Sequence, residues 1–302
     1  MLLNNMPKES FDRAASDIAT FFEKHPFKAY TTHDIQQIFD SEKDKWRIAN
    51  YRNYKHFITF LNDRKILLLD VQNHEGHTSE KRILRKKEAT PFHVGLTVKK
   101  DGYLSYYSAM QIHQLTLQLP KTVYVSEEKY EDAYALKPEN VELEQDAVDR
   151  AFSKPQRVAR ESYKSTFDGF RYVYLQRKHT SINIGITKRQ NLTVTDLERT
   201  LIDIAVRPVY SGGAFEVLEA FKNAKSNIDV TKLNEYLIQL DYIYPYHQLI
   251  GFYLDLIGFS KKDLQLFLDK KTNINFYQAY NLSNKKLNEK WGIYHPIGIE
   301  AL

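Results

Sequence analysis

The chain has 302 residues and contains no cysteine. Without a thiol it can form no disulfide bond, no thiolate zinc site and no cysteine nucleophile, and this composition fits a reducing compartment. At this length the chain can form two domains, each with its own core. Its charged and apolar fractions, 27% and 42%, are those of an ordinary globular protein.

The chain also lacks a long apolar run. No segment approaches the length that is needed to cross a bilayer. The first residues, MLLNNMPKE, hold no basic segment that leads into an apolar one. We therefore expect a cytoplasmic protein that has no membrane partner.

Several catalytic motifs are missing as well. There is no phosphate-binding Gly-x-x-x-x-Gly-Lys loop, no Gly-x-Gly-x-x-Gly turn and no Gly-x-Ser-x-Gly nucleophile elbow. His74 and His77 have the spacing of a metal pair but no third ligand nearby. Some nucleases have an Asp…Glu-x-Lys set that resembles Asp101, Glu127 and Lys129. A solvated strand end is a simpler explanation for Glu127 and Lys129. The sequence thus predicts no catalytic residue, no metal site and no cofactor.

Charge is distributed unevenly along the chain, although its net value is only +5. Two basic clusters precede an acidic stretch at residues 127–149. The first cluster consists of Lys45, Arg47, Arg52 and Lys55. The second consists of Lys81, Arg82, Arg85, Lys86 and Lys87. This layout offers one face to a polyanion and another to a basic or neutral partner.

The first 90 residues carry the pattern of three helices followed by a β-hairpin. Apolar side chains at helical spacing predict helices at residues 10–24, 32–39 and 51–63. Strands are expected at residues 66–71 and 81–87, on either side of a polar tip. This order predicts an N-terminal winged helix-turn-helix domain at residues 1–90.

The third predicted helix has two distinct faces. Its apolar face consists of Tyr54, Phe57, Ile58 and Leu61. The polar side chains opposite are those of Arg52, Lys55, His56 and Thr59. Such residues suit base edges and phosphates in a DNA major groove, and the second basic cluster would contact phosphates or the minor groove from the wing. The sequence therefore predicts DNA binding; the alternative is a pair of solvated basic faces.

Beyond residue 90 the pattern predicts a larger mixed α/β domain at residues 91–302 that ends in a helical bundle-like region. Strands are expected at residues 92–98, 122–125 and 291–294, and a hairpin at residues 170–176 and 181–186. Helices are expected at residues 105–114, 196–206, 212–224, 231–240, 246–257 and 261–269. The predicted fold class of the whole chain is α+β.

One segment of the second predicted domain combines polar and apolar residues in a distinctive order. Thr195 and Glu198 have the spacing of a capping box at a helix start. Arg199 and Asp203 follow on the same helix. We interpret Glu198, Arg199 and Asp203 as a cap and a solvated or ion-paired face rather than as a catalytic set. The helix must end near Pro208.

Two segments resemble the AbiEi family of antitoxins, the DNA-binding partners in type IV toxin–antitoxin and abortive-infection operons. The first is TVTDLERTLIDIA at residues 193–205, followed by Arg207-Pro208 and Ser211-Gly212-Gly213. The second lies upstream and reads GYLSYYSAM, HQL and LPKTVYV within residues 102–125. The family signature residues are Thr195, Glu198, Arg199, Asp203, Gly212 and Gly213, to which we assign structural roles.

The resemblance implies a transcriptional autorepressor with no enzymatic activity. Such a protein binds inverted repeats in its own operator and counteracts a nucleotidyltransferase toxin in phage defence, as a functional partner that need not bind it tightly. Its larger domain would carry the antitoxin activity. Two alternatives remain at this stage: a nuclease or other nucleic-acid-processing enzyme that a winged helix targets, and a repressor that has no toxin partner. The sequence does not indicate the oligomeric state.

Overall fold

The computed structural model describes residues 10–128, 143–158, 161–177 and 183–301, and these residues form a mixed α+β fold. The chain divides into two compact units. The first unit comprises Met1–Lys100 and Ser162–Tyr172, and the second comprises Asp101–Glu161 and Val173–Leu302. No helix among the described residues is both long and apolar enough to span a bilayer.

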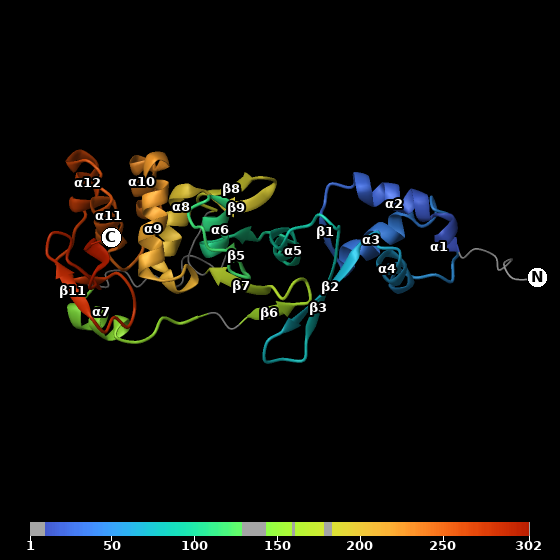
Figure 1. Cartoon of the computed structure of the whole chain (residues 1–302), viewed down its shortest axis with the longest axis horizontal. Coiled ribbons are helices and arrows are strands. Elements are labelled where there is room, and N and C mark those ends of the chain that lie inside the picture. The colour runs from blue at the N-terminus through green and yellow to red at the C-terminus, as the bar shows by residue number, and fades with distance from the viewer. Residues whose placement is uncertain (1–9, 129–142, 159–160, 178–182, 302) are drawn as a thin grey trace, which may run out of the picture. The chain divides into compact units, whose positions relative to one another are not determined.

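The first unit alternates helices and strands from its start. Its elements are α1 (Ser10–Arg13), α2 (Ala15–Lys24), β1 (Ala29–Thr31), α3 (Thr32–Glu42), α4 (Tyr54–Asp63), β2 (Leu68–His74), β3 (Glu80–Arg85), α5 (Pro91–Val98) and β6 (Ser162–Ser165), as Figure 1 labels them. The strands lie in the order β1-β3-β2-β6, and the described pairs are all antiparallel. The three predicted helices and the predicted hairpin are therefore present, while β1 and β6 are additions.

Helix capping and an aromatic core fix these helices. Thr31 with Asp34, and Asn53 with His56, form the capping boxes that begin α3 and α4. The core between the helices and the sheet is rich in aromatic side chains, including Phe11, Phe22, Tyr30, Phe39, Trp46 and Phe57. Burial of these rings stabilises the helices of this unit, because short helices are marginal alone.

The strand predicted at residues 92–98 is wrong. This segment forms α5, in which Thr90 caps the first turn and Pro91 occupies the first helical position. Proline has the backbone angle of a helix start and no amide hydrogen to leave unpaired, so it favours a helix here over the apolar, β-branched pattern that suggested a strand. Because α5 belongs to the first unit, the boundary lies after Lys100, beyond the boundary expected at residues 90 and 91.

The second unit contains strands first and then a series of helices. Its elements are β4 (Tyr103–Leu104), α6 (Tyr106–Ile112), β5 (Thr122–Glu128), α7 (Gln145–Phe152), β7 (Arg171–Arg177, whose first two residues belong to the first unit), β8 (Ile186–Arg189), β9 (Leu192–Thr195), α8 (Leu197–Val206), α9 (Ala214–Ala224), α10 (Val230–Leu240), α11 (Tyr246–Leu256), α12 (Lys261–Leu268), β10 (Phe276–Tyr277), β11 (Lys285–Asn288) and β12 (Ile293–Pro296). The strands β7-β5-β4-β9-β8 are neighbours in that order, and β10-β12-β11 form a second sheet.

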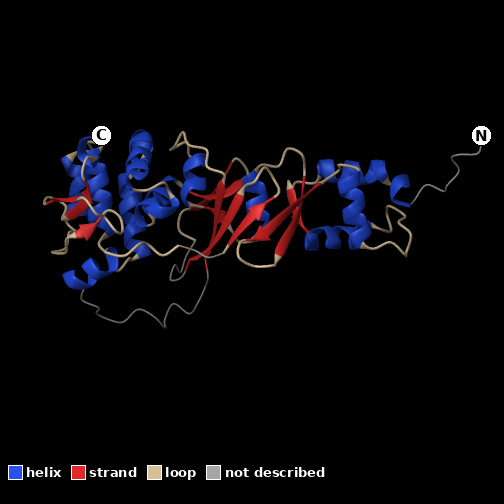
Figure 2. Cartoon of the chain, turned by 60° about the horizontal axis from the view of Figure 1, so that its bottom comes forward, coloured by secondary structure: helices blue, strands red, loops and turns tan. Residues whose placement is uncertain are grey.

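Two expectations for the second unit need correction. The hairpin predicted at residues 170–176 and 181–186 does not form: β7 lies beside β5, and β8 pairs with β9 through a turn at Gln190 and Asn191. Residues 178–182 lie outside the described residues. The five predicted helices after residue 196 are present. The strand expected at residues 291–294 corresponds to β12, but it lies in a sheet with β10 and β11, which Figure 2 shows among the helices of this unit.

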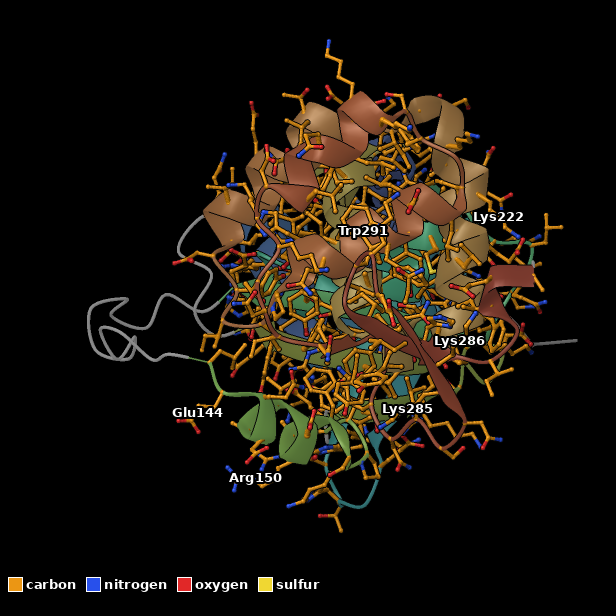
Figure 3. All side chains as sticks on the ribbon, turned by 90° about the vertical axis from the view of Figure 1, so that its left-hand side faces the viewer. Glu144, Arg150, Lys222, Lys285, Lys286 and Trp291 are labelled. Carbon is orange, nitrogen blue, oxygen red and sulfur yellow. The ribbon has the colours of Figure 1, made fainter. Side chains whose placement is uncertain are left out.

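Trp291 anchors this last segment in the core. Its side chain is fully buried, and its indole Nε1 donates a hydrogen bond to Asp255 Oδ2 at 2.7 Å. Figure 3 shows Trp291 in the middle of the packed side chains, with Lys285 and Lys286 on β11 nearer the edge. The small sheet therefore closes the helical core instead of forming a separate tail.

Candidate nucleic-acid interface and the signature network

Helix α4 presents the polar face that its sequence predicts. Phe57 and Leu61 are fully buried, whereas Lys55, His56 and Thr59 are exposed. Asn53 accepts hydrogen bonds from the backbone amides of Lys55 and His56, which holds the start of the helix. An exposed helix N-terminus with a lysine and a histidine on it can approach a polyanion.

The first basic cluster is less uniform than its sequence suggests. Lys45 and Arg47 are exposed, and the Lys45 ammonium lies 2.8 Å from Glu42 Oε1. Arg52 is half-buried just before α4, and its guanidinium lies 5.5 Å from the ring centre of Phe11 and 5.1 Å from that of Tyr51. Arg52 thus packs on aromatic rings, so it is a weaker candidate for base contact than Lys55.

The second basic cluster separates into members with different roles. Lys86 is 5% exposed, and its ammonium donates hydrogen bonds to the carbonyl oxygens of Glu23 and His25 at the end of α2. Burial lowers the pKa of Lys86. Lys86 is therefore a weaker candidate for DNA contact than its sequence suggests, because its ammonium is buried against the carbonyl groups at the end of α2.

The other four members of this cluster lie on or beside β3. The Lys81 ammonium lies 3.9 Å from the ring centre of Tyr163, and the Arg85 guanidinium lies 3.6 Å from that of Phe167. Arg82 is exposed and lies 2.7 Å from Glu80, and Lys87 is exposed. Arg82 and Lys87 are the members of this cluster whose exposure suits contact with a ligand.

His74 and His77 stack instead of presenting two metal ligands. Their ring centres are 4.2 Å apart, and His74 also stacks on Tyr163 at 4.5 Å. Among the described residues no group of three or more potential ligands is arranged to hold a metal ion. Of the nuclease-like set, Lys129 lies outside the described residues, and Glu127 Oε1 accepts a hydrogen bond from Gln176.

The signature residues begin α8, but not as predicted. Asp196, rather than Thr195, caps the helix by accepting a hydrogen bond from the amide of Arg199 at 2.9 Å. Thr195 is the last residue of β9, and its hydroxyl pairs with that of Thr200 at 2.8 Å. The capping box of Thr195 and Glu198 is therefore wrong, because the strand extends one residue further than the pattern indicates.

Arg199 is the centre of a buried network of charges. Its side chain is inaccessible to solvent, and so is that of Asp203. Arg199 Nε donates to Asp203 Oδ1 at 3.0 Å, Nη2 donates to Glu128 Oε1 at 3.0 Å, and Nη1 donates to the carbonyl of Ile184 at 2.5 Å. Arg177 reaches the other oxygen of Asp203 at 2.5 Å. The predicted solvated face is thus wrong, and the ion-paired interpretation is confirmed.

The electrostatics of this network favour the charged forms of its members. Burial alone would raise the pKa of Asp203, but the guanidinium groups of Arg177 and Arg199 outweigh that effect and hold the pKa below its usual range. Burial lowers the pKa of Arg177, but the attraction of Asp203, together with that of neighbouring tyrosines, raises the pKa overall. Both carboxylate oxygens of Asp203 accept hydrogen bonds from arginine side chains, so we assign this network a structural role.

Glu198 extends the charged network toward α10. Lys232 lies 2.9 Å from both Glu198 Oε2 and Asp196 Oδ2, and the hydroxyl of Tyr236 donates to Asp196 Oδ2 at 2.8 Å. Desolvation opposes the charge of Lys232, but its two carboxylate partners raise the pKa of the amine overall. The signature therefore ties α8 to α10.

The paired glycines of the signature shape the entry to α9. Gly212 and Gly213 have φ values of +82° and +93°, which a residue with a side chain adopts only under strain. A Cβ atom at Gly212 would lie 3.0 Å from Glu216 and 3.1 Å from Tyr107. The place of both glycines in the family pattern thus has a sufficient structural explanation.

His113 links α6 to the hairpin of β8 and β9. Its Nε2 lies 2.6 Å from the carbonyl oxygen of Thr195, and its Nδ1 lies 3.0 Å from Arg189 Nη1. This arrangement requires a neutral ring that donates from Nε2 and accepts at Nδ1. Burial first, and Arg189 in addition, lower the pKa of His113, although the Thr195 carbonyl and the carboxylates of Asp196 and Glu198 oppose the shift.

We expect the His113→Gln variant to lose less stability on acidification than the unaltered chain. The folded state holds His113 neutral, whereas the unfolded state takes up a proton as the pH falls through about 6.5. The contribution of His113 to the free energy of unfolding is therefore fully present above that pH and decreases as the pH falls below it. Urea unfolding at pH 7.5 and 5.5 measures the difference, and equal losses in both proteins would contradict this role for His113.

Comparison with known proteins gives a likeness of fold. No family model matches the chain, and no curated protein matches it. A solved structure, described as "Crystal structure of RV2827C protein from Mycobacterium tuberculosis", is similar with a TM-score of 0.58 and 14% sequence identity. The similarity covers 98% of this chain and 94% of that one. At this identity the likeness concerns the fold alone.

Proposed function

We propose that the chain is a DNA-binding antitoxin that represses its own operon. The observation that carries DNA binding is the exposed face of α4, with Lys55, His56 and Thr59 beside one another. The order of helix, strand, two helices and hairpin in the first unit, with β1 paired to β3, supports a winged helix-turn-helix. In that fold α4 would be the recognition helix and β2 and β3 the wing.

The antitoxin part of the proposal rests on the signature in the second unit. In the AbiEi-like pattern, the charged residues Glu198, Arg199 and Asp203 are buried at the start of α8, and Gly212 and Gly213 precede α9. They therefore support the integrity of the unit, and the surface of the unit would act against a cognate nucleotidyltransferase toxin. Growth rescue on co-expression with a nucleotidyltransferase encoded beside this chain tests this assignment, and failure of rescue by a folded protein would contradict it.

Replacing Lys55 and His56 together by Ala should weaken binding to the operator by about 1–3 kcal/mol for each side chain that reads a base. Both side chains are exposed and neither belongs to the core, although the variant loses the hydrogen bond of His56 in the capping box, so circular dichroism verifies the fold. Titration of the full-length protein with DNA from its own promoter, at fixed salt, measures the effect. Lys262→Ala, an exposed lysine on α12, serves as the control for a simple change of net charge. Unchanged affinity of the double variant would exclude α4 as the recognition helix.

A further inference from the structure

Strand β6 brings a basic residue from a distant part of the sequence onto the first unit. β6 pairs with β2 in an antiparallel register that places Lys164 opposite Asn73 and Ser165 opposite Gln72. The hairpin of β2 and β3 is therefore extended by a third strand on its β2 side. Lys164 lies in the sequence far beyond both of the predicted basic clusters.

The register shows which face of this sheet carries Lys164. Side chains alternate between faces along a strand, and directly paired residues share a face. On β2, Asn73 lies on the same face as Val71 and Leu69, and their partners on β3 are Glu80, Arg82 and Leu84. Leu69 and Leu84 pack in the core with the helices. Lys164 and Arg82 therefore extend the face of the sheet that α4 covers.

Buried hydrogen bonds on the opposite face fix β6 in this register. Asp70 is 1% exposed and accepts hydrogen bonds from the hydroxyls of Ser165 and Thr166, at 2.5 and 3.0 Å, and from the amide of Phe167 at 3.0 Å. A shift of one residue would reverse both faces and leave the Asp70 carboxylate without these donors. The position of Lys164 is thus determined by the core of the unit.

Lys164 also differs from its basic neighbours because its ammonium group is available to contact a ligand. It is exposed, and no ion pair joins it to any residue that the structure describes. Arg82 on the same face is paired with Glu80, and Lys81 on the opposite face lies over the ring of Tyr163. Hydrogen bonding by Ser162 and then Arg171 lowers the pKa of Glu75, and the positive charge of Lys164 adds a smaller effect in the same direction.

We propose that Lys164 contacts a DNA phosphate from the third strand of the wing. The inference rests on the proposed DNA binding of α4 and extends it to a surface formed by β2, β3 and β6. A single exposed ammonium on this face would contribute charge neutralisation without reading sequence. The face that carries it is the same face that α4 covers, so one duplex can meet both.

The test compares the salt dependence of DNA binding for the full chain and three variants. Lys164→Gln should flatten the slope of log affinity against log salt by about one unit. Between 50 and 200 mM salt, the DNA affinity of the unaltered chain should therefore fall about 3.5-fold more than that of the variant. Lys164→Arg should keep the slope. Lys262→Gln removes the same charge from α12 in the second unit and should also keep it.

The outcomes separate this inference from the function on which it rests. If the unaltered chain binds its promoter DNA and Lys164→Gln leaves the slope unchanged, the inference is wrong and the proposed function stands. Equal flattening by Lys164→Gln and Lys262→Gln would also overturn it, because the effect would then follow from net charge alone. If the unaltered chain shows no binding to promoter DNA, both are overturned. Circular dichroism of each variant verifies the fold.

Discussion

The Asp203→Ala variant should lose about 3–5 kcal/mol of unfolding free energy, which is the usual cost of removing one partner from a buried ion pair. Asp203 is inaccessible to solvent and accepts hydrogen bonds from both Arg177 and Arg199. Without the carboxylate, two guanidinium groups would face each other in the core, and among the described residues Glu128 is the remaining carboxylate paired with either of them. The second unit should therefore unfold at a much lower denaturant concentration.

Urea unfolding measures this loss most directly through Trp291, which lies in the same unit. Trp46 lies in the first unit, so a Trp46→Phe background leaves a single reporter. Glu219→Ala is a matched control that removes a carboxylate from the exposed pair with Lys222, and it should cost less than about 1 kcal/mol. A loss of similar size in Asp203→Ala and Glu219→Ala would show that the buried network contributes no more than a surface pair.

The local parts of this fold could be predicted from the sequence. Helices such as α4 and α12 begin at side chains that cap them, Asn53 and Ser260, and continue as apolar residues at helical spacing. Both signals lie within a few residues of one another. The exposed face of α4, including Lys55 and His56, follows from the same spacing.

The parts that could not be predicted depend on residues far apart in the chain. β6 joins the first unit because Asp70 bonds Ser165, Thr166 and Phe167, and no local pattern indicates this pairing. A division at residue 91 would therefore separate the first unit from both α5 and Ser162–Tyr172. Expression of residues 1–90 would leave the buried Asp70 without its partners.

The burial of the signature charges is a second case of this kind. Arg199 is surrounded by Glu128, Asp203 and the carbonyl of Ile184, which come from three separate segments. On the sequence alone a run of Glu, Arg and Asp in an amphipathic helix resembles a solvated face. Their position in the core becomes clear only when three segments pack together: β5, α8 and the segment that precedes β8. The same holds for Lys86, whose carbonyl partners are about sixty residues away.

Gly251→Ala should destabilise the second unit by about 2–3 kcal/mol, although Ala is otherwise the better helix former by about 1 kcal/mol. Gly251 lies within α11, and a Cβ atom there would come within 2.1 Å of Cζ3 and 2.4 Å of Cη2 of Trp291. The indole cannot withdraw, because its ring is fully buried and its Nε1 is bonded to Asp255. The glycine is thus required by the ring that lies against it.

A double-mutant cycle with Trp291→Leu separates this contact from a general weakening of α11. Trp291→Leu alone should cost about 3 kcal/mol through the cavity that it leaves. With the large ring gone, Gly251→Ala should cost nothing or stabilise α11, because the new methyl group occupies the vacated space and the helix gains propensity. The expected coupling between the two sites is about 2–3 kcal/mol. Thermal and urea unfolding followed by circular dichroism measure all four proteins, and additive losses would show that Gly251 is required for a reason other than Trp291.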